Sequence, residues 1–104
     1  MAHRPRRRMI DPGIWENDCL AEMDPATVLL FVGCISLADD DGRLKGAPRR
    51  LLTRIHEQRQ GITEADIEAQ LVELEMAGVI HRYDVSGKQY IRLPNWEKHQ
   101  SNTA

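Results

Sequence analysis

The sequence predicts an α+β fold of the winged helix-turn-helix type, with three main helices, a C-terminal β-hairpin wing and a short N-terminal helix. Apolar residues follow helical spacing through three segments between residues 25 and 77, and after Gly78 the pattern changes to two short β-prone runs. A chain of 104 residues with 41% hydrophobic content can bury one modest core. We therefore expect one domain over residues 9–98, between a flexible basic arm (1–8) and a flexible tail (99–104).

The N-terminal segment before the first main helix divides into two parts. Residues 1–8, MAHRPRRR, are basic and have no apolar periodicity, so we expect them to stay mobile until an anionic partner orders them. Residues 9–23 place apolar groups irregularly around Asp11-Pro12-Gly13, which indicates a turn and one short helix. Trp15 is expected to anchor this helix against the domain.

The first main helix is predicted to begin at Asp24-Pro25, because the Asp side chain can accept from backbone N–H groups and Pro has no N–H of its own. Its apolar residues, between Val28 and Leu37, cover most of its circumference, which is typical of a helix packed on several sides. Cys34 lies among them and is expected to be buried. Neither cysteine has the spacing of a CxxC motif, so we expect both to be reduced.

A second and a third helix are predicted after the turn Asp39-Asp40-Asp41-Gly42 and a short extended segment at 43–45. Pro48 suits the first turn of the second helix, and Thr63 with Asp66 forms an Asp variant of the capping box at the start of the third. The residues predicted to be buried on these two helices are Leu51, Leu52, Ile55, Ile67, Leu71 and Leu74.

The hairpin is predicted from residues 79–84 and 89–93, two β-prone runs joined by Val85-Ser86-Gly87-Lys88. Pro94 ends the second strand, and Trp96 is expected to dock the polar segment that follows.

The two predicted helices after residue 43 carry opposite charges. Residues 43–59 contain six basic residues and one acid, a net charge of +5, whereas residues 63–77 contain five acids and no base. In a winged helix the later helix usually enters the major groove, and here it would bring carboxylates toward phosphates. The charges therefore favour nucleic-acid contact by other elements.

Four separated motifs occur in order along the chain: RMIDPGIW (8–15), LADDDGRL (37–44), LEMAGVI (74–80) and YIRLPNWEKHQ (90–100). Together they resemble the N-terminal domain of phage and prophage replication-initiator-like DNA-binding proteins, over about residues 8–100. The resemblance implies a winged helix that binds double-stranded DNA in phage DNA replication or its control, with phage or host replication or regulatory proteins as further partners. It also implies a location in the cytoplasm of a bacterial host.

Three basic elements are candidates for contact with the phosphate backbone: the arm, the second helix and the wing. An Arg-rich arm suits the minor groove, and a wing commonly touches phosphate, so together they could straddle a duplex. The alternative is a solubilising surface with a disordered tail. The candidate nucleic-acid-binding residues are Arg4, Arg6, Arg7, Arg8, Arg49, Arg50, Arg54, Arg82, Lys88 and Arg92.

The acidic third helix suggests a different function, a protein-interaction module that docks onto a basic partner or onto the second helix of another copy in a homodimer. A third interpretation is a solvated acidic face paired with Arg49, Arg50 or Arg54. The candidate interaction residues are Glu64, Glu68, Glu73 and Glu75.

Enzymatic, cofactor-binding and metal-binding functions are not expected. The four histidines are scattered, the cysteines lack zinc-ligand spacing, and neither GxxxxGK nor GxSxG occurs. No apolar run approaches the roughly 18–20 residues that span a bilayer. We therefore expect a cytoplasmic binding protein without a membrane partner.

Overall fold

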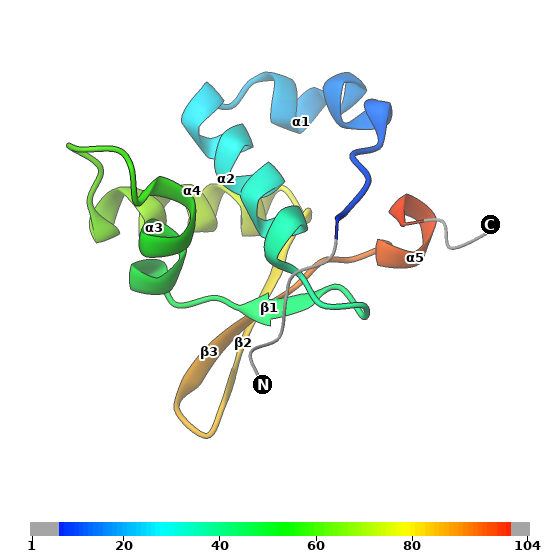
Figure 1. The fold of residues 1–104 in the computed structure, drawn as a ribbon. Coiled ribbons are helices and arrows are strands. Elements are labelled where there is room, and N and C mark those ends of the chain that lie inside the picture. Colours follow the sequence, from blue (N-terminus) through cyan, green and yellow to red (C-terminus); the bar gives the residue numbers. More distant parts are fainter. Residues whose placement is uncertain (1–6, 101–104) are drawn as a thin grey trace.

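A computed structural model describes residues 7–100 of the chain. It has an α+β architecture in which helices lie over one side of a three-stranded antiparallel sheet and the hairpin extends away from them (Figure 1). The elements are η1 (Pro12–Glu16), α1 (Asp18–Ala21), α2 (Pro25–Leu37), β1 (Arg43–Lys45), α3 (Pro48–His56), α4 (Glu64–Met76), β2 (His81–Val85), β3 (Lys88–Arg92) and α5 (Trp96–His99). The α+β class is confirmed, and this order is compatible with a winged helix. Arg4, Arg6 and residues 101–104 lie outside the described residues.

Capping hydrogen bonds confirm the predicted starts of α2 and α4, and α3 begins at Pro48 as predicted, without a side-chain cap. Asp24 Oδ1 accepts from the N–H of Ala26 at 2.9 Å, ahead of Pro25. At α4 the Thr63 hydroxyl accepts from the N–H of Asp66 at 3.1 Å, and Asp66 Oδ2 accepts from the N–H of Thr63 at 2.9 Å. This reciprocal pair satisfies two N–H groups that have no partner within the helix.

The sheet has the strand order β1-β3-β2, so the segment before α3 pairs with the second strand of the hairpin. Ser86 and Gly87 form the hairpin turn with φ angles of 51° and 80°. Two central residues with positive φ match the right-handed twist of the flanking strands, and this turn pairs Val85 with Lys88. Every other cross-strand pair in the hairpin follows from that register.

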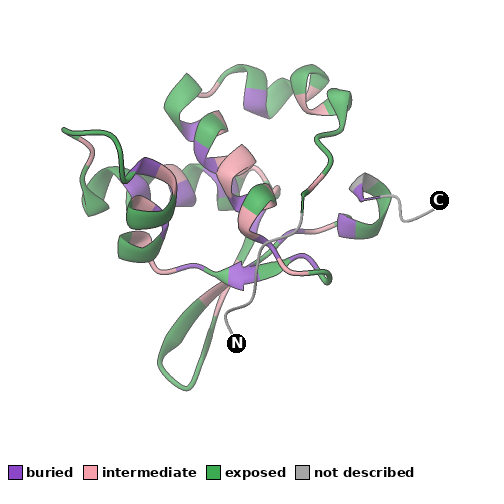
Figure 2. Cartoon of the chain, in the orientation of Figure 1, coloured by how far each residue is buried: buried purple, intermediate pink, exposed green. Residues whose placement is uncertain are grey.

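The core lies where α2, α3 and α4 meet the inner face of the sheet (Figure 2). Burial of Leu51, Ile67, Leu71 and Leu74 confirms most of the predicted stripes, while Leu52 and Ile55 are half-buried. Cys34 is also fully buried, and burial raises the pKa of its thiol to about 12, so the thiol stays protonated.

The two tryptophans have opposite environments. Trp96 is 7% exposed, as predicted, but Trp15 is 66% exposed, so its predicted role as an anchor is wrong. Successive residues of a 3₁₀ helix lie about 120° apart, so Ile14 and Trp15 cannot both face the core. In η1 it is Ile14 that packs against the core.

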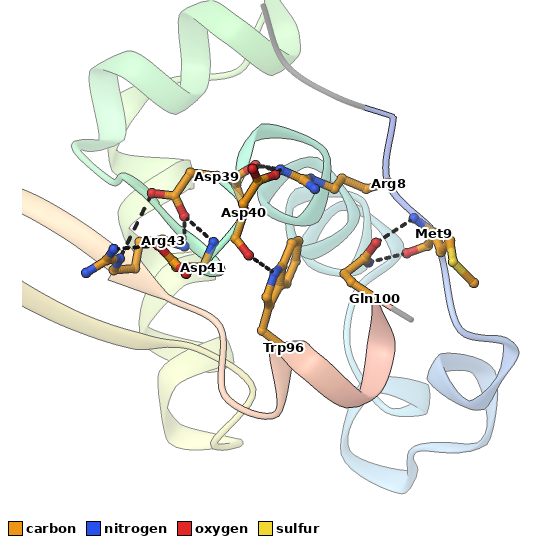
Figure 3. A network of polar contacts seen from close by, with 9 residues as sticks. Arg8, Met9, Asp39, Asp40, Asp41, Arg43, Trp96 and Gln100 are labelled. Carbon is orange, nitrogen blue, oxygen red and sulfur yellow. Dashed lines mark hydrogen bonds and ion pairs between the residues drawn. The ribbon is translucent and has the colours of Figure 1, made fainter. Parts of the chain in front are cut away.

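Both ends of the predicted domain are tied down more closely than expected (Figure 3). The side chain of Arg8 is 9% exposed; it donates to the carbonyl of Ala38 and pairs with Asp40 at 3.0 Å. Gln100 is buried; it accepts from the N–H of Met9 at 2.9 Å and donates to the Met9 carbonyl at 2.7 Å. Arg8 therefore belongs to the folded domain instead of the arm, and Gln100 instead of the tail.

A buried histidine at the end of α3 makes stability depend on pH. His56 is 4% exposed, and its Nδ1 lies 3.4 Å from Nη1 of Arg59. Burial lowers the pKa of His56, and the Arg59 charge lowers it further. The folded protein therefore resists protonation that the unfolded chain accepts below about pH 6.5.

We expect the stability associated with His56 to be complete above pH 6.5 and to fall as the pH drops toward the folded pKa. Urea midpoints at pH 7.5 and pH 5 should therefore differ more for the wild type than for His56→Gln, which stays neutral at both. An equal pH dependence in the two proteins would show that other groups cause it.

Candidate nucleic-acid interface

The face of the sheet turned away from the core, which we call the outer face, has cations and no Asp or Glu at its strand positions within residues 7–100. Side chains of directly paired residues point to the same side of a sheet, and positions i and i+2 share a face. Leu44 and Ile91 are buried on the inner face, so their strand neighbours lie on the outer one. The outer-face residues are Arg43, Lys45, His81, Tyr83, Val85, Lys88, Tyr90 and Arg92.

Arg49, Arg50 and Arg54 on α3 are exposed, as the sequence analysis predicts. Leu51 turns to the core from the same helix, so the arginines lie on the remaining surface. None of the three forms a hydrogen bond or ion pair within residues 7–100. The structure therefore does not pair them with the acidic helix, and their charges are available to an external anion.

An open groove of about 570 Å³ joins α3 to the outer face of the sheet. It passes the C-terminal end of α2, where Asp39 is its one acidic lining residue. Asp39 Oδ1 accepts from the N–H groups of Asp41 and Arg43, at 2.9 and 3.0 Å. Four cations and one carboxylate line the groove, which is therefore positively charged overall, although Arg43 also pairs with Asp41 at 2.9 Å. Its cationic and aromatic side chains are Arg43, Lys45, Arg50, Arg54, Tyr83 and Tyr90.

Three aromatic rings lie next to one another on the outer face. Tyr83 and Tyr90 are a direct cross-strand pair whose ring centres are 5.7 Å apart, with their planes inclined by 21°. The His81 ring lies 6.1 Å from that of Tyr83, at 17°. Both tyrosines are half-buried and line the groove, so its floor combines aromatic surface with flanking cations.

Arg82 faces α4 and is separated from the other wing cations. Its guanidinium donates to both carboxylate oxygens of Glu68, at 2.8 and 2.9 Å, and its side chain is only 19% exposed. Hydrogen bonding from Arg82 holds the pKa of Glu68 below its usual value. The hairpin register explains this placement, because Arg82 pairs with Ile91 on the inner face.

Most of the candidate interaction carboxylates on α4 already have partners inside the molecule. Glu73 Oε1 accepts from the Thr27 hydroxyl at 2.9 Å, and Glu75 Oε2 accepts from the N–H of Arg82 at 3.0 Å. With Glu68 paired to Arg82, only Glu64 of the four forms no hydrogen bond or ion pair within residues 7–100. The charge of α4 is therefore partly used to hold the hairpin and α2 in place.

The structure brings together only some of the predicted nucleic-acid contacts. Lys88 and Arg92 lie on the outer face with the groove strands, and Arg7 is exposed near the N-terminal end. Arg8 and Arg82 are instead held by Asp40 and Glu68. Four groove residues were not predicted as site residues from the sequence: Arg43, Lys45, Tyr83 and Tyr90. Strand alternation and the turn Ser86-Gly87 were signals that could have placed the tyrosines.

Within the described part of the chain, no three His, Cys, Asp or Glu side chains gather as a metal site requires. No helix in residues 7–100 is long and apolar enough to cross a membrane. Comparisons with protein-family models, curated proteins and solved structures find no match to this chain.

Proposed function

We propose that this protein is a winged-helix DNA-binding protein that holds the phosphate backbone in the groove between α3 and the outer face of the sheet. The observation that carries the proposal is the convergence of Lys45, Arg50 and Arg54 on one concave surface. Such a surface binds polyanions because neutralised phosphates release their counterions. The resemblance to phage replication-initiator-like proteins supports a role in phage DNA replication or its control, in the cytoplasm of a bacterial host.

The arrangement of charges favours a complex in which α3 and the sheet contact the DNA over one in which α4 enters the major groove. The exposed surface of α4 carries Glu64 and Glu68, and the carboxamide oxygen of Gln70 is buried without a hydrogen-bond partner among residues 7–100. Gln70, whose side-chain type can pair with an adenine edge, is therefore not positioned to read one.

The salt dependence of binding tests the proposal. We expect log Kd for a labelled random duplex to rise with log salt concentration, with a slope of about 3 to 5. Lys45→Gln/Arg50→Gln/Arg54→Gln should lower that slope by about 2 to 3, because each phosphate contact contributes about 0.9. Fluorescence anisotropy across a salt series measures both.

A control removes cations elsewhere on the surface. Arg59 and Lys98 are exposed and outside the groove lining, so Arg59→Gln/Lys98→Gln should change the slope little. Equal loss in the two variants would indicate attraction by overall charge. Absence of binding by the wild type at low salt would refute the function.

A further inference from the structure

We propose that the groove takes an unpaired strand of nucleic acid, with bases stacked on Tyr83 and Tyr90 and phosphates held by Lys45, Arg50 and Arg54. The inference rests on the proposed function, since it requires the groove to bind nucleic acid. It goes further in naming the form of the ligand, a single strand or the single-stranded part of a junction.

The aromatic pair lies where bases of an unpaired strand could stack on it. Tyr83 and Tyr90 are central in the hairpin, and both line the same groove as the α3 arginines. Their ring centres lie 5.7 Å apart with the planes inclined by 21°, so the two rings stack on each other, and the ring surface they leave open forms an apolar part of the groove floor that a base can extend. A base has an aromatic face of similar extent, and stacking of bases on aromatic side chains is largely independent of sequence.

A duplex and an unpaired strand offer different surfaces to this groove. Paired bases hide their faces in the helical stack and expose only their edges in the grooves. An aromatic floor therefore gains little from intact duplex DNA. An unpaired strand exposes both its base faces and its phosphates, which match the two kinds of side chain in this groove.

The cations around the rings are also placed to hold the phosphates of such a strand. Lys45 pairs with Tyr90 across β1 and β3, and Arg50 and Arg54 line the groove from α3. Cations on β1 and α3 thus lie beside the tyrosines. A single strand needs such a surface, because it presents a phosphate next to every base. The chemistry is common to DNA and RNA, so both belong in the test.

The test measures anisotropy of a labelled oligo-dT, an oligo-rU of the same length and a random duplex. For Tyr83→Leu/Tyr90→Leu we expect the affinity for single strands to fall about 5- to 100-fold, which corresponds to the loss of roughly one stacked base. The affinity for the duplex should change less than about twofold. The matched pair Tyr83→Phe/Tyr90→Phe keeps both rings and should keep single-strand binding. Thermal unfolding by circular dichroism checks that each variant is folded.

A cross-linking experiment on the wild type avoids dependence on the variants. An oligonucleotide containing 5-iodouracil, irradiated in the complex, should give adducts that mass spectrometry locates at Tyr83 or Tyr90. Adducts confined to residues outside the groove would overturn the inference, as would an equal loss of single-strand and duplex binding in a folded leucine variant. Preference for oligo-dT or oligo-rU identifies the natural strand as DNA or RNA.

The outcomes separate this inference from the proposed function. If the duplex binds in the groove and the leucine pair leaves oligo-dT and oligo-rU binding unchanged, the inference fails and the proposed function stands. If no nucleic acid binds the wild type, both fail. A single-strand affinity that depends on both the tyrosines and the groove cations supports both.

Discussion

Replacing Trp96 by alanine is expected to lower the free energy of unfolding by about 3–5 kcal/mol. The indole N–H donates to the carbonyl of Asp40 at 2.9 Å, and the guanidinium of Arg8 lies 5.2 Å from the ring centre. Gly42 packs so closely that an added Cβ would lie 2.6 Å from Trp96 Cγ. Truncation would leave a cavity and remove a hydrogen-bond donor from Asp40.

Trp15 provides the matched control for this experiment. The same substitution, Trp15→Ala, removes a side chain that is 66% exposed and should change stability by less than about 0.5 kcal/mol. Urea unfolding followed by circular dichroism measures both variants without depending on tryptophan fluorescence. Equal destabilisation by the two substitutions would contradict the assignment of Trp96 as the anchor.

The contacts of Trp96 explain what three of the four sequence motifs do. Arg8 comes from the first, Asp40 and Gly42 from the second, and Trp96 from the fourth, and these residues meet in one cluster (Figure 3). The motifs that support the resemblance thus hold the N-terminal segment, the Asp-rich turn and α5 together. They specify how the domain closes, and the second and fourth motifs also supply Arg43 and Tyr90 to the lining of the candidate groove.

Features governed by local chemistry were predictable from the sequence. Caps such as Asp24 and Thr63 bond to groups within three residues, and the turn at Ser86-Gly87 spans four residues. Both partners of each contact therefore lie in the same short segment of sequence. The buried stripe of α4 also follows from spacing along one helix. These elements agree with the structure because no distant partner was needed to decide them.

The environments of individual charged and aromatic residues depend on distant partners. Arg8 reads as part of a basic arm, yet it is held by Asp40, 32 positions away. Arg82 reads as a wing cation, yet Glu68 holds it from α4. The groove depends on β1 pairing with β3, which brings Lys45 beside Tyr90 across 45 residues of chain. Composition and periodicity carry no information about such pairings.

Reversing two charges on α3, with Arg50→Glu/Arg54→Glu, is expected to weaken duplex binding about 100-fold or more at about 50 mM salt. Each lost phosphate contact costs on the order of tenfold under these conditions, and each new carboxylate adds repulsion. Both side chains are exposed and without partners in residues 7–100, so the fold should persist. Anisotropy with a labelled duplex measures the loss, and Arg59→Glu/Lys98→Glu is the matched reversal outside the groove.

The same measurement with Glu64→Lys decides which helix faces the nucleic acid. Glu64 begins α4 and is exposed, and unlike Glu68 it can be changed without breaking the ion pair to Arg82. If α3 and the sheet contact the DNA, Glu64→Lys should alter duplex affinity by no more than about twofold, because the reversed charge lies outside the groove lining. A large gain in affinity from Glu64→Lys, with little loss from the α3 reversal, would instead place α4 against the phosphates.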